Sequence, residues 1–350
     1  MSPHFRKISI LRLLFAIVFF NILFNILGPA FAFAHEKWFV NNTVGIARPE
    51  LLSSWNSMTI AVALLSLSAI VVAFVLEFVL KRTPLSVRWE TLVIRYLRPL
   101  EPWTGTVLGI LTGVMLAAAS VQGHLFAPNF SLHDVMPTLR LPLLLLQGLI
   151  GVSFLLGFFV RVSSVLFGAL LLLSFFLFSW QDVLDNLLLF GVAGYLFING
   201  RGRWSLDEHV WAPQWLWLKN VFVVPISSVN VLRIVAGLNF LYLGSHKILQ
   251  PELDVALLEK FPFLNFMPLL GFPEFTNDAF ILCAGAVEIV LSILLLSGVL
   301  TRLLAVILAG PFTATILLFG PGDLFGHLPH FGLFFLLFVF GNQKRPLKKQ

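Results

Sequence analysis

The side chains best suited to chemistry stand inside apolar runs in the last third of the 350-residue chain. Glu288 lies near the middle of one run, and His327 and His330 lie one helical turn apart in another. Asn239 and His246 are seven residues apart, so they share a helix face two turns apart. A carboxylate at membrane depth is costly and usually faces the interior of a helix bundle. The spacing therefore predicts a cavity with Glu288 at its floor and the amide and imidazole groups around its outer half.

Three interpretations of this set are carried forward. Imidazoles can accept the hydroxyl protons of a quinol headgroup, and a buried acid can pass a proton on. Imidazole is also the commonest nitrogen ligand of copper and zinc. Alternatively, a protonated Glu288 locks two helices by a hydrogen bond, and the histidines are interfacial groups satisfied by water or backbone. The single cysteine, Cys283, excludes an internal dithiol, so redox chemistry would need another carrier.

The elements that position these groups follow from the composition. Hydrophobic residues make up 58% of the chain and charged residues 11%, whereas a soluble domain has roughly a quarter of its residues charged. The apolar residues form runs of about 20, the length that crosses a bilayer as a helix. We therefore expect an all-α polytopic membrane protein with the lipid bilayer around it. The net charge of +6 fits basic cytoplasmic loops rather than nucleic-acid binding.

About ten transmembrane helices are expected from the apolar runs. Residues 1–34 have a basic start, an apolar middle and a small-x-small end, so they are either a cleaved signal peptide or the first span. Lys and Arg gather at 81–101 and in the tail at 342–350, which the positive-inside rule places in the cytoplasm. This topology fits a bacterial inner membrane and a cytoplasmic C-terminus. The remaining spans are approximately residues 58–80, 104–126, 141–160, 162–178, 183–199, 226–248, 277–300, 302–319 and 327–340.

An internal repeat relates residues 147–200 to residues 288–341 at one fixed offset. The repeat predicts two tandem four-helix bundles with the same orientation in the membrane. Arginines of the repeat stand at the inner ends of helices, where they also suit simple snorkelling anchors. The matched residues are Gly157 with Gly298, Arg161 with Arg302, Asp182 with Asp323, and Gly200 with Gly341.

The repeat and the charge pattern together divide the chain. The expected order is a signal peptide or first span, a periplasmic segment with the second span and a basic loop, and then the two bundles joined by an interfacial linker. Arg201 and Asp207, at the end of the first bundle, would tie the linker through an ion pair. The boundaries are 1–34 for the signal peptide or first span, 35–103 for the periplasmic segment, second span and basic loop, 104–203 for the first bundle, 204–225 for the linker, 226–341 for the second bundle and 342–350 for the tail.

Three motifs carry a family resemblance. The seventh span reads Arg233-x3-Gly237-x2-Phe240-x3-Gly244-x2-Lys247, and Glu288 is followed by Gly298-x2-Thr301-Arg302. Residues 200–207 read Gly-Arg-Gly-Arg-Trp-Ser-Leu-Asp. These stretches resemble the opening, second and closing signatures of the DoxX-like family, which includes the DoxD subunit of thiosulfate:quinone oxidoreductase. The resemblance covers roughly residues 104–341 and implies a four-helix unit, present here twice.

The resemblance also implies a function, which we state as an expectation. The protein would be a membrane subunit of a quinone-linked oxidoreductase, with quinone as cofactor and a second oxidoreductase subunit as partner. The first unit, which has Gln147 where the second has Glu288, would be mainly structural. Catalytic candidates are Glu288, His327, His330 and His246; cofactor-binding candidates are Asn239, Arg233, Lys247 and Arg302; no metal ligand is assigned.

Two other functions fit the same sequence. The chain could be a non-catalytic anchor or assembly protein that recruits a soluble partner, or a carrier of a metal or small molecule. The second unit departs from the family pattern after Gly341, where the chain reads Asn-Gln-Lys-Arg instead of ending in Ser-Leu-Asp.

Overall fold

The computed structural model describes residues 40, 51, 57–132, 138–207, 228–273 and 275–341. The expected signal peptide or first span, the linker beyond Asp207 and the basic tail lie outside these residues. Within the described ranges the regular secondary structure is helical, and the only extended pairing there is an isolated bridge between His124 and Ser131. Six helical stretches there are long and apolar enough to cross a membrane, and three apolar helices are shorter. The expected all-α polytopic membrane protein is thus confirmed.

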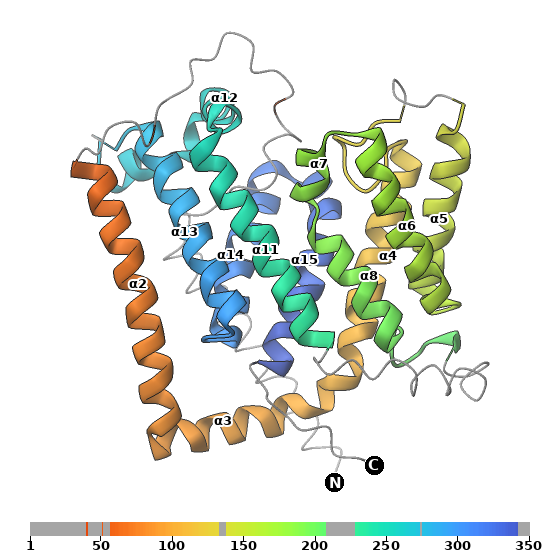
Figure 1. Ribbon diagram of the computed structural model, residues 1–350, viewed down its shortest axis with the longest axis horizontal. Helices are drawn as coiled ribbons and strands as arrows, with labels where there is room; N and C mark the ends of the chain where they lie inside the picture. Colours follow the sequence, from red (N-terminus) through yellow and green to blue (C-terminus); the bar gives the residue numbers. More distant parts are fainter. Residues whose placement is uncertain are drawn as a thin grey trace.

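Figure 1 shows upright helices side by side, with α12 at one end of the bundle and α3 at the other. Near the middle, the second predicted unit (α11 to α15) meets the first (α4 to α8). The helices are α2 (Ser57–Arg82), α3 (Pro84–Leu97), η3 (Arg98–Trp103), α4 (Thr104–Gln122), α5 (Arg140–Leu156), α6 (Val160–Leu177), α7 (Trp180–Asp185), α8 (Leu188–Asn199), α11 (Ser228–Leu249), α12 (Glu252–Lys260), η4 (Pro262–Leu264), η5 (Met267–Leu270), α13 (Asn277–Ser297), α14 (Thr301–Phe319) and α15 (Pro321–Phe340).

The basic segment predicted as a loop is in fact helix α3, which crosses the base of the bundle at a steep angle to α2 (Figure 1). Pro84 begins the helix, a position where its missing N–H and fixed φ are tolerated. Leu97 is buried against the bundle, while Trp89 is 62% exposed and Arg88 is exposed. Charged residues interrupt the apolar ones in this segment, so it does not read as an apolar span.

The predicted span at 183–199 is broken into α7 and α8. The break is stabilised from another helix, because the Nδ2 atom of Asn239 donates to the carbonyls of Leu184 and Asp185 at 2.9 and 3.0 Å. The Oδ1 atom of Asn239 accepts from the backbone N–H of Leu188 at 3.3 Å. These bonds satisfy backbone groups that an unbroken helix would pair internally. The sequence of the span itself contains no glycine or proline at this point to signal the break.

The turns that join α5 to α6 and α13 to α14 have the same geometry. Gly157 and Gly298 end the first helix of each pair with φ of 69° and 75°. Phe159 and Leu300 precede the second helix with φ of 51° and 49°, which is uncommon outside glycine. The residues of each pair are separated by the offset of the predicted repeat.

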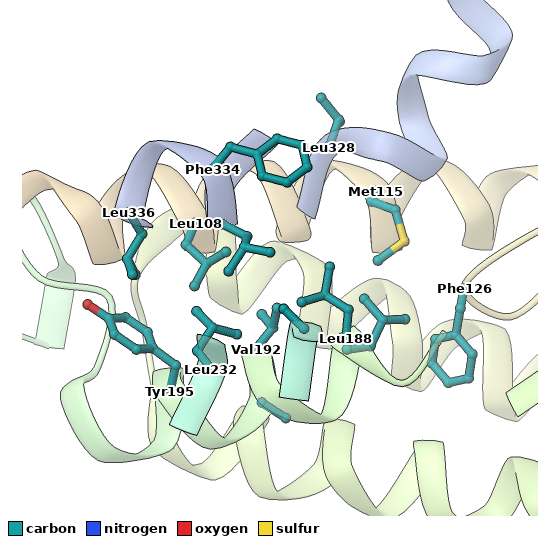
Figure 2. Packing of buried hydrophobic residues seen from close by; sticks show 14 of the residues in the cluster. Leu108, Met115, Phe126, Leu188, Val192, Tyr195, Leu232, Leu328, Phe334 and Leu336 are labelled. Atoms are coloured by element: carbon teal, nitrogen blue, oxygen red, sulfur yellow. The ribbon is translucent and has the colours of Figure 1, made fainter. Parts of the chain in front are cut away.

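The two units meet through two helix pairs, α4 with α15 and α8 with α11. At Gly332 of α15, an added Cβ would lie 3.0 Å from the Cα of Leu108 on α4. At Gly191 of α8, an added Cβ would lie 3.0 Å from Leu232 and Val235 on α11. Figure 2 shows the apolar core at this junction, with side chains from α4, α8, α11 and α15 interdigitated. Each unit therefore packs its last helix on the first helix of the other.

Candidate functional site

An ion pair joins the two main signatures of the second unit. The Nζ atom of Lys247, near the end of α11, lies 3.3 Å from Oε1 of Glu288, in the middle of α13. The Lys247 side chain is 3% exposed and that of Glu288 is 21% exposed. Gly244 and Gly285 allow this contact, because an added Cβ on Gly244 would lie 2.8 Å from the Cβ of Glu288 and 2.8 Å from the carbonyl oxygen of Gly285. The glycines thus bring the helix backbones close enough for the pair to form.

The two histidines of α15 lie inside the bundle, in an aromatic cluster. His327 and His330 are 0% and 5% exposed. The ring of His330 stacks on Phe312 of α14 at 4.7 Å, and His327 meets the same ring edge-on at 5.0 Å. Phe240 of α11 lies 6.2 Å from His330. Both histidines are therefore enclosed by helices rather than exposed on the surface of the bundle.

The ion pair and the aromatic cluster both contact helix α11 of the second unit. Phe240, Gly244 and Lys247 are spaced i, i+4, i+7, so they form one stripe on α11. This stripe contacts His330 through Phe240 and Glu288 through Lys247. At 1.5 Å per residue, Phe240, His330 and Glu288 each lie about 14 to 17 Å from the α12 end of their helices. By the same measure, Lys247 begins about 3 Å and His327 about 9 Å from that end, so the carboxylate, the ammonium group and the two imidazoles are spread along the bundle.

Asn239 and His246 share a face of α11, but this face is directed at the first unit. Asn239 uses its amide at the break between α7 and α8. His246 lies 5.8 Å from the ring of Tyr242, which in turn lies 6.4 Å from Trp180 of α7. The prediction that Asn239 lines a site with Glu288 is wrong, because its hydrogen bonds tie the two units together. The ring of His246 lies beside Tyr242, whose own ring meets Trp180 of α7.

The arginines assigned to a cofactor hold helix ends instead. Arg233 Nη1 donates to the carbonyls of Leu295 and Leu296 at 2.6 and 3.3 Å, where α13 ends. Arg302 donates to the carbonyls of Phe338 and Phe340 at 3.1 and 3.2 Å, where α15 ends. Carbonyls at a helix C-terminus carry partial negative charge and favour a cation. Both guanidinium groups therefore lie at the α3 end, away from the layer of Glu288, and the prediction that they bind a cofactor there is wrong.

In the first unit, Gln147, which the predicted repeat matches with Glu288, is fully buried. Its Oε1 atom accepts from the N–H of Phe126 at 3.0 Å. Its Nε2 atom lies 3.2 Å from each of three acceptors, which are the carbonyls of Leu116 and His124 and the hydroxyl of Ser120. A neutral amide thus locks this unit where the second unit has a charged pair.

The closing motif of the first unit also differs from its prediction. Asp207 accepts from the N–H groups of Phe159 and Val160 at 2.7 and 2.9 Å, instead of pairing with Arg201. Arg201 donates to the carbonyls of Phe154, Leu155 and Trp204. Burial lowers the pKa of Arg201, and the charge of Asp207 acts in the opposite direction. Both side chains thus fix the turn between α5 and α6.

The sequence reasoning missed Lys247 as the counter-ion of Glu288, and Phe312 and Phe240 as neighbours of the histidines. An ionised Glu288 inside a membrane needs a cation, and Lys247 is the cation in the neighbouring family motif. These two facts together were the signal for the pair. Nothing in the sequence singles out Phe312 among 37 phenylalanines. Within the described ranges, no three His, Cys, Asp or Glu side chains lie together in an arrangement that could hold a metal ion.

Comparison with known proteins identifies part of this unit. Residues 228–321 match the DoxX family model. No curated protein and no solved structure matches the chain. The matched segment runs from α11 to the first residue of α15, so it includes Lys247, Glu288 and Phe312. The chain therefore contains a DoxX domain at residues 228–321, within an integral membrane protein.

Proposed function

We propose that this protein is a bacterial inner-membrane subunit of a quinone-linked oxidoreductase, with its proton-active site in the DoxX domain. The observation that supports this proposal is the Lys247–Glu288 ion pair inside the spanning bundle. Ionisable residues within membrane helices are expensive and commonly mark substrate or proton pathways. The same unit also buries the two imidazoles of His327 and His330.

The residues present fit a quinone headgroup. Phe312 and Phe240 enclose the imidazoles of His327 and His330 with aromatic rings, and the imidazoles can donate or accept hydrogen bonds. A bound quinone would take up electrons delivered by a second oxidoreductase subunit together with protons from the protein. Glu288 would exchange its proton with the imidazoles, and the ammonium group would stabilise its ionised form.

We further propose that residues 104–207 are a second copy of the DoxX unit. Four features at one offset support this: the left-handed glycines at 157 and 298, the left-handed residues at 159 and 300, the arginines at 161 and 302 that bond carbonyls near the end of the last helix, and the interface glycines at 191 and 332. The last helix of each unit packs on the first helix of the other, which is the arrangement expected when two similar units are related by a two-fold axis. The first copy, with Gln147, would be structural.

The orientation follows from charge. Basic residues gather at the α3 end of the described helices, on α2, on α3 and in the turns that begin α6 and α14. By the positive-inside rule we place this end in the cytoplasm. Glu288 would then lie near the middle of its span, and Lys247 near the periplasmic end of its helix.

The proposal is tested on full-length protein purified in mild detergent. Extracted quinone is quantified, and binding of a quinone-site inhibitor is titrated for the wild type, Glu288→Gln, His330→Leu and, as a control on the other face of α11, His246→Leu. We expect inhibitor binding to be lost in the first two variants and kept in the control. Binding that survives both changes, or absence of quinone and of inhibitor binding in the wild type, would refute the site.

The same preparations distinguish the alternatives. A soluble partner that remains bound in Glu288→Gln, without any quinone, would support an anchor or assembly role. Stoichiometric copper or zinc that is lost in His327→Ala would support a metal carrier.

A further inference from the structure

The turn that starts α6 is capped by a carboxylate from its own unit. Phe159 and Val160 donate their N–H groups to Asp207, and Gly157 accepts from the hydroxyl of Ser205 at 2.6 Å. The N–H groups at a helix start have no partner within the helix and favour a negative charge. Because Phe159 is left-handed, the carboxylate also holds a strained backbone in place. The Ser-Leu-Asp segment thus closes the α3 end of the first unit.

The second unit has the same turn but not the same segment. Leu300 is left-handed like Phe159, yet the chain after Gly341 continues as Asn-Gln-Lys-Arg. The backbone N–H of Leu300 donates at 3.3 Å to Oε2 of Glu77, which belongs to α2. The carbonyl of Gly298 accepts from the hydroxyl of Thr301 at 3.1 Å, as that of Gly157 accepts from a serine. A carboxylate from a helix outside the unit therefore stands where the first unit uses its own aspartate.

The placement of Glu77 depends on how α2 packs. Ile70, Ala73 and Glu77 are spaced i, i+3, i+7 and form one stripe on α2, the helix that packs along α13. Ala73 is buried in the main core and Ile70 packs against it, whereas most of α2 is exposed to the surroundings. Figure 1 shows α2 at the edge of the bundle and α3 running beneath it toward α4. The stripe thus aims the carboxylate at the turn after α13.

Helix α3 makes a second contact with the same region. Oε1 of Glu90 lies 3.2 Å from Nη1 of Arg302, the arginine that binds the carbonyls at the end of α15. The Glu90 side chain is half exposed, so this ion pair contributes less than the contact of Glu77. In the first unit, the corresponding Arg161 is influenced by the charge of Asp207. Two carboxylates of the α2–α3 segment thus act where one aspartate acts in the first unit.

We propose that α2 and α3 are the closing element of the DoxX domain, in place of its missing Ser-Leu-Asp segment, and that Glu77 is the positioning residue for the turn between α13 and α14. Because α13 carries Glu288, this contact fixes the register of the helix that bears the site. The comparison with the first unit draws on the proposed duplication, but the contact of Glu77 with Leu300 stands without it and without any redox role.

The test is hydrogen–deuterium exchange on the full-length protein in lipid nanodiscs, read on peptides that cover residues 298–304 and 157–163. Glu77→Ala should accelerate exchange about tenfold in the second-unit turn only, since a hydrogen bond to a charged group is lost. Asp207→Ala, the matched control, should accelerate exchange in the first-unit turn only. Glu77→Gln, which keeps an acceptor oxygen, should retain most of the protection. Unchanged exchange at 298–304 in Glu77→Ala, or equal acceleration in both turns, overturns the proposal.

A rescue variant tests the replacement itself. Pro346, Leu347 and Lys348 follow Gly341 at the distances at which Ser205-Leu206-Asp207 follows Gly200. Pro346→Ser with Lys348→Asp, added to Glu77→Ala, should restore protection at residues 298–304. Restored protection supports the idea that a Ser-Leu-Asp segment and the α2–α3 segment can replace each other. If protection is not restored, that idea is overturned, and Glu77→Ala alone still tests the role of Glu77. Quinone-inhibitor binding measured in parallel separates failure of this proposal from failure of the proposed function.

Discussion

Replacement of Lys247 by methionine gives the sharpest test of the buried ion pair. Methionine has a similar length and no charge, so the change removes the ammonium group that lies 3.3 Å from Glu288 and keeps most of the packing. The Lys247 side chain is 3% exposed, so in the variant water cannot take the place of the ammonium group beside Glu288. Removal of one partner from a buried pair typically costs about 3–5 kcal/mol, because a charge is left without compensation.

Proton uptake limits this cost and makes it depend on pH. A glutamate with the ordinary pKa of about 4.3 can be neutralised at a cost of about 3.7 kcal/mol at pH 7 and about 1 kcal/mol at pH 5. In Lys247→Met the folded state would hold a proton that the unfolded state lacks, so stability falls as the pH rises. We therefore expect a loss of up to about 3.7 kcal/mol at pH 7 that shrinks to about 1 kcal/mol at pH 5.

Reversible unfolding of the purified protein in mixed micelles, titrated at pH 5 and pH 7, measures this loss. The double variant Lys247→Met with Glu288→Gln completes a thermodynamic cycle and should be more stable at pH 7 than Lys247→Met, because no charge remains in the pair. The reasoning is refuted if the loss in Lys247→Met does not change with pH, or if the two single losses simply add in the double variant.

Three further changes test the packing around the site by the same unfolding assay. Gly244→Ala should cost about 1–3 kcal/mol, because its Cβ would lie 2.8 Å from the Cβ of Glu288, whereas Gly168→Ala, with no atom within 4 Å of an added Cβ, should be neutral or stabilising. Asn239→Leu should cost about 1–3 kcal/mol, because backbone groups at the break between α7 and α8 lose their partners. Gln147→Glu should lower stability at neutral pH and recover toward acid pH, because an ionised carboxylate would face the two carbonyls that Nε2 now binds. Equal stability of both glycine variants, or no loss in the other two, would contradict these contacts.

The spans and the positions of the turns could be predicted because they depend on local signals. Long apolar runs mark helices, and Gly157 and Gly298 stand where a left-handed residue must end one. The interior position of Glu288 followed from the cost of a charge in lipid. These inferences need no knowledge of which helix packs against which.

What could not be predicted depends on contacts between distant helices. Asn239 was assigned to the site because it shares a helix face with His246. A shared face does not say which helix lies opposite it. In the structure the opposite element is the break between α7 and α8. Lysine and arginine at helix ends look alike in sequence, yet Lys247 reaches an acid in mid-span whereas Arg233 binds carbonyls at a helix end. What separates the two cases is the partner on α13, an acid beside Lys247 and helix-end carbonyls beside Arg233, and only the packing reveals it.

The contrast between Gln147 and Glu288 bears most directly on function. In the first unit, a neutral amide with four hydrogen-bond contacts holds the first two helices together, so the packing at this position needs no charge. In the second unit, the corresponding position carries an acid, and a lysine must be buried beside it. Well-packed neutral residues are often as stable as such a pair, so stability alone does not favour the charges. A charged pair that folding does not require, in the unit that also buries two imidazoles, argues for a role in moving protons at a bound ligand.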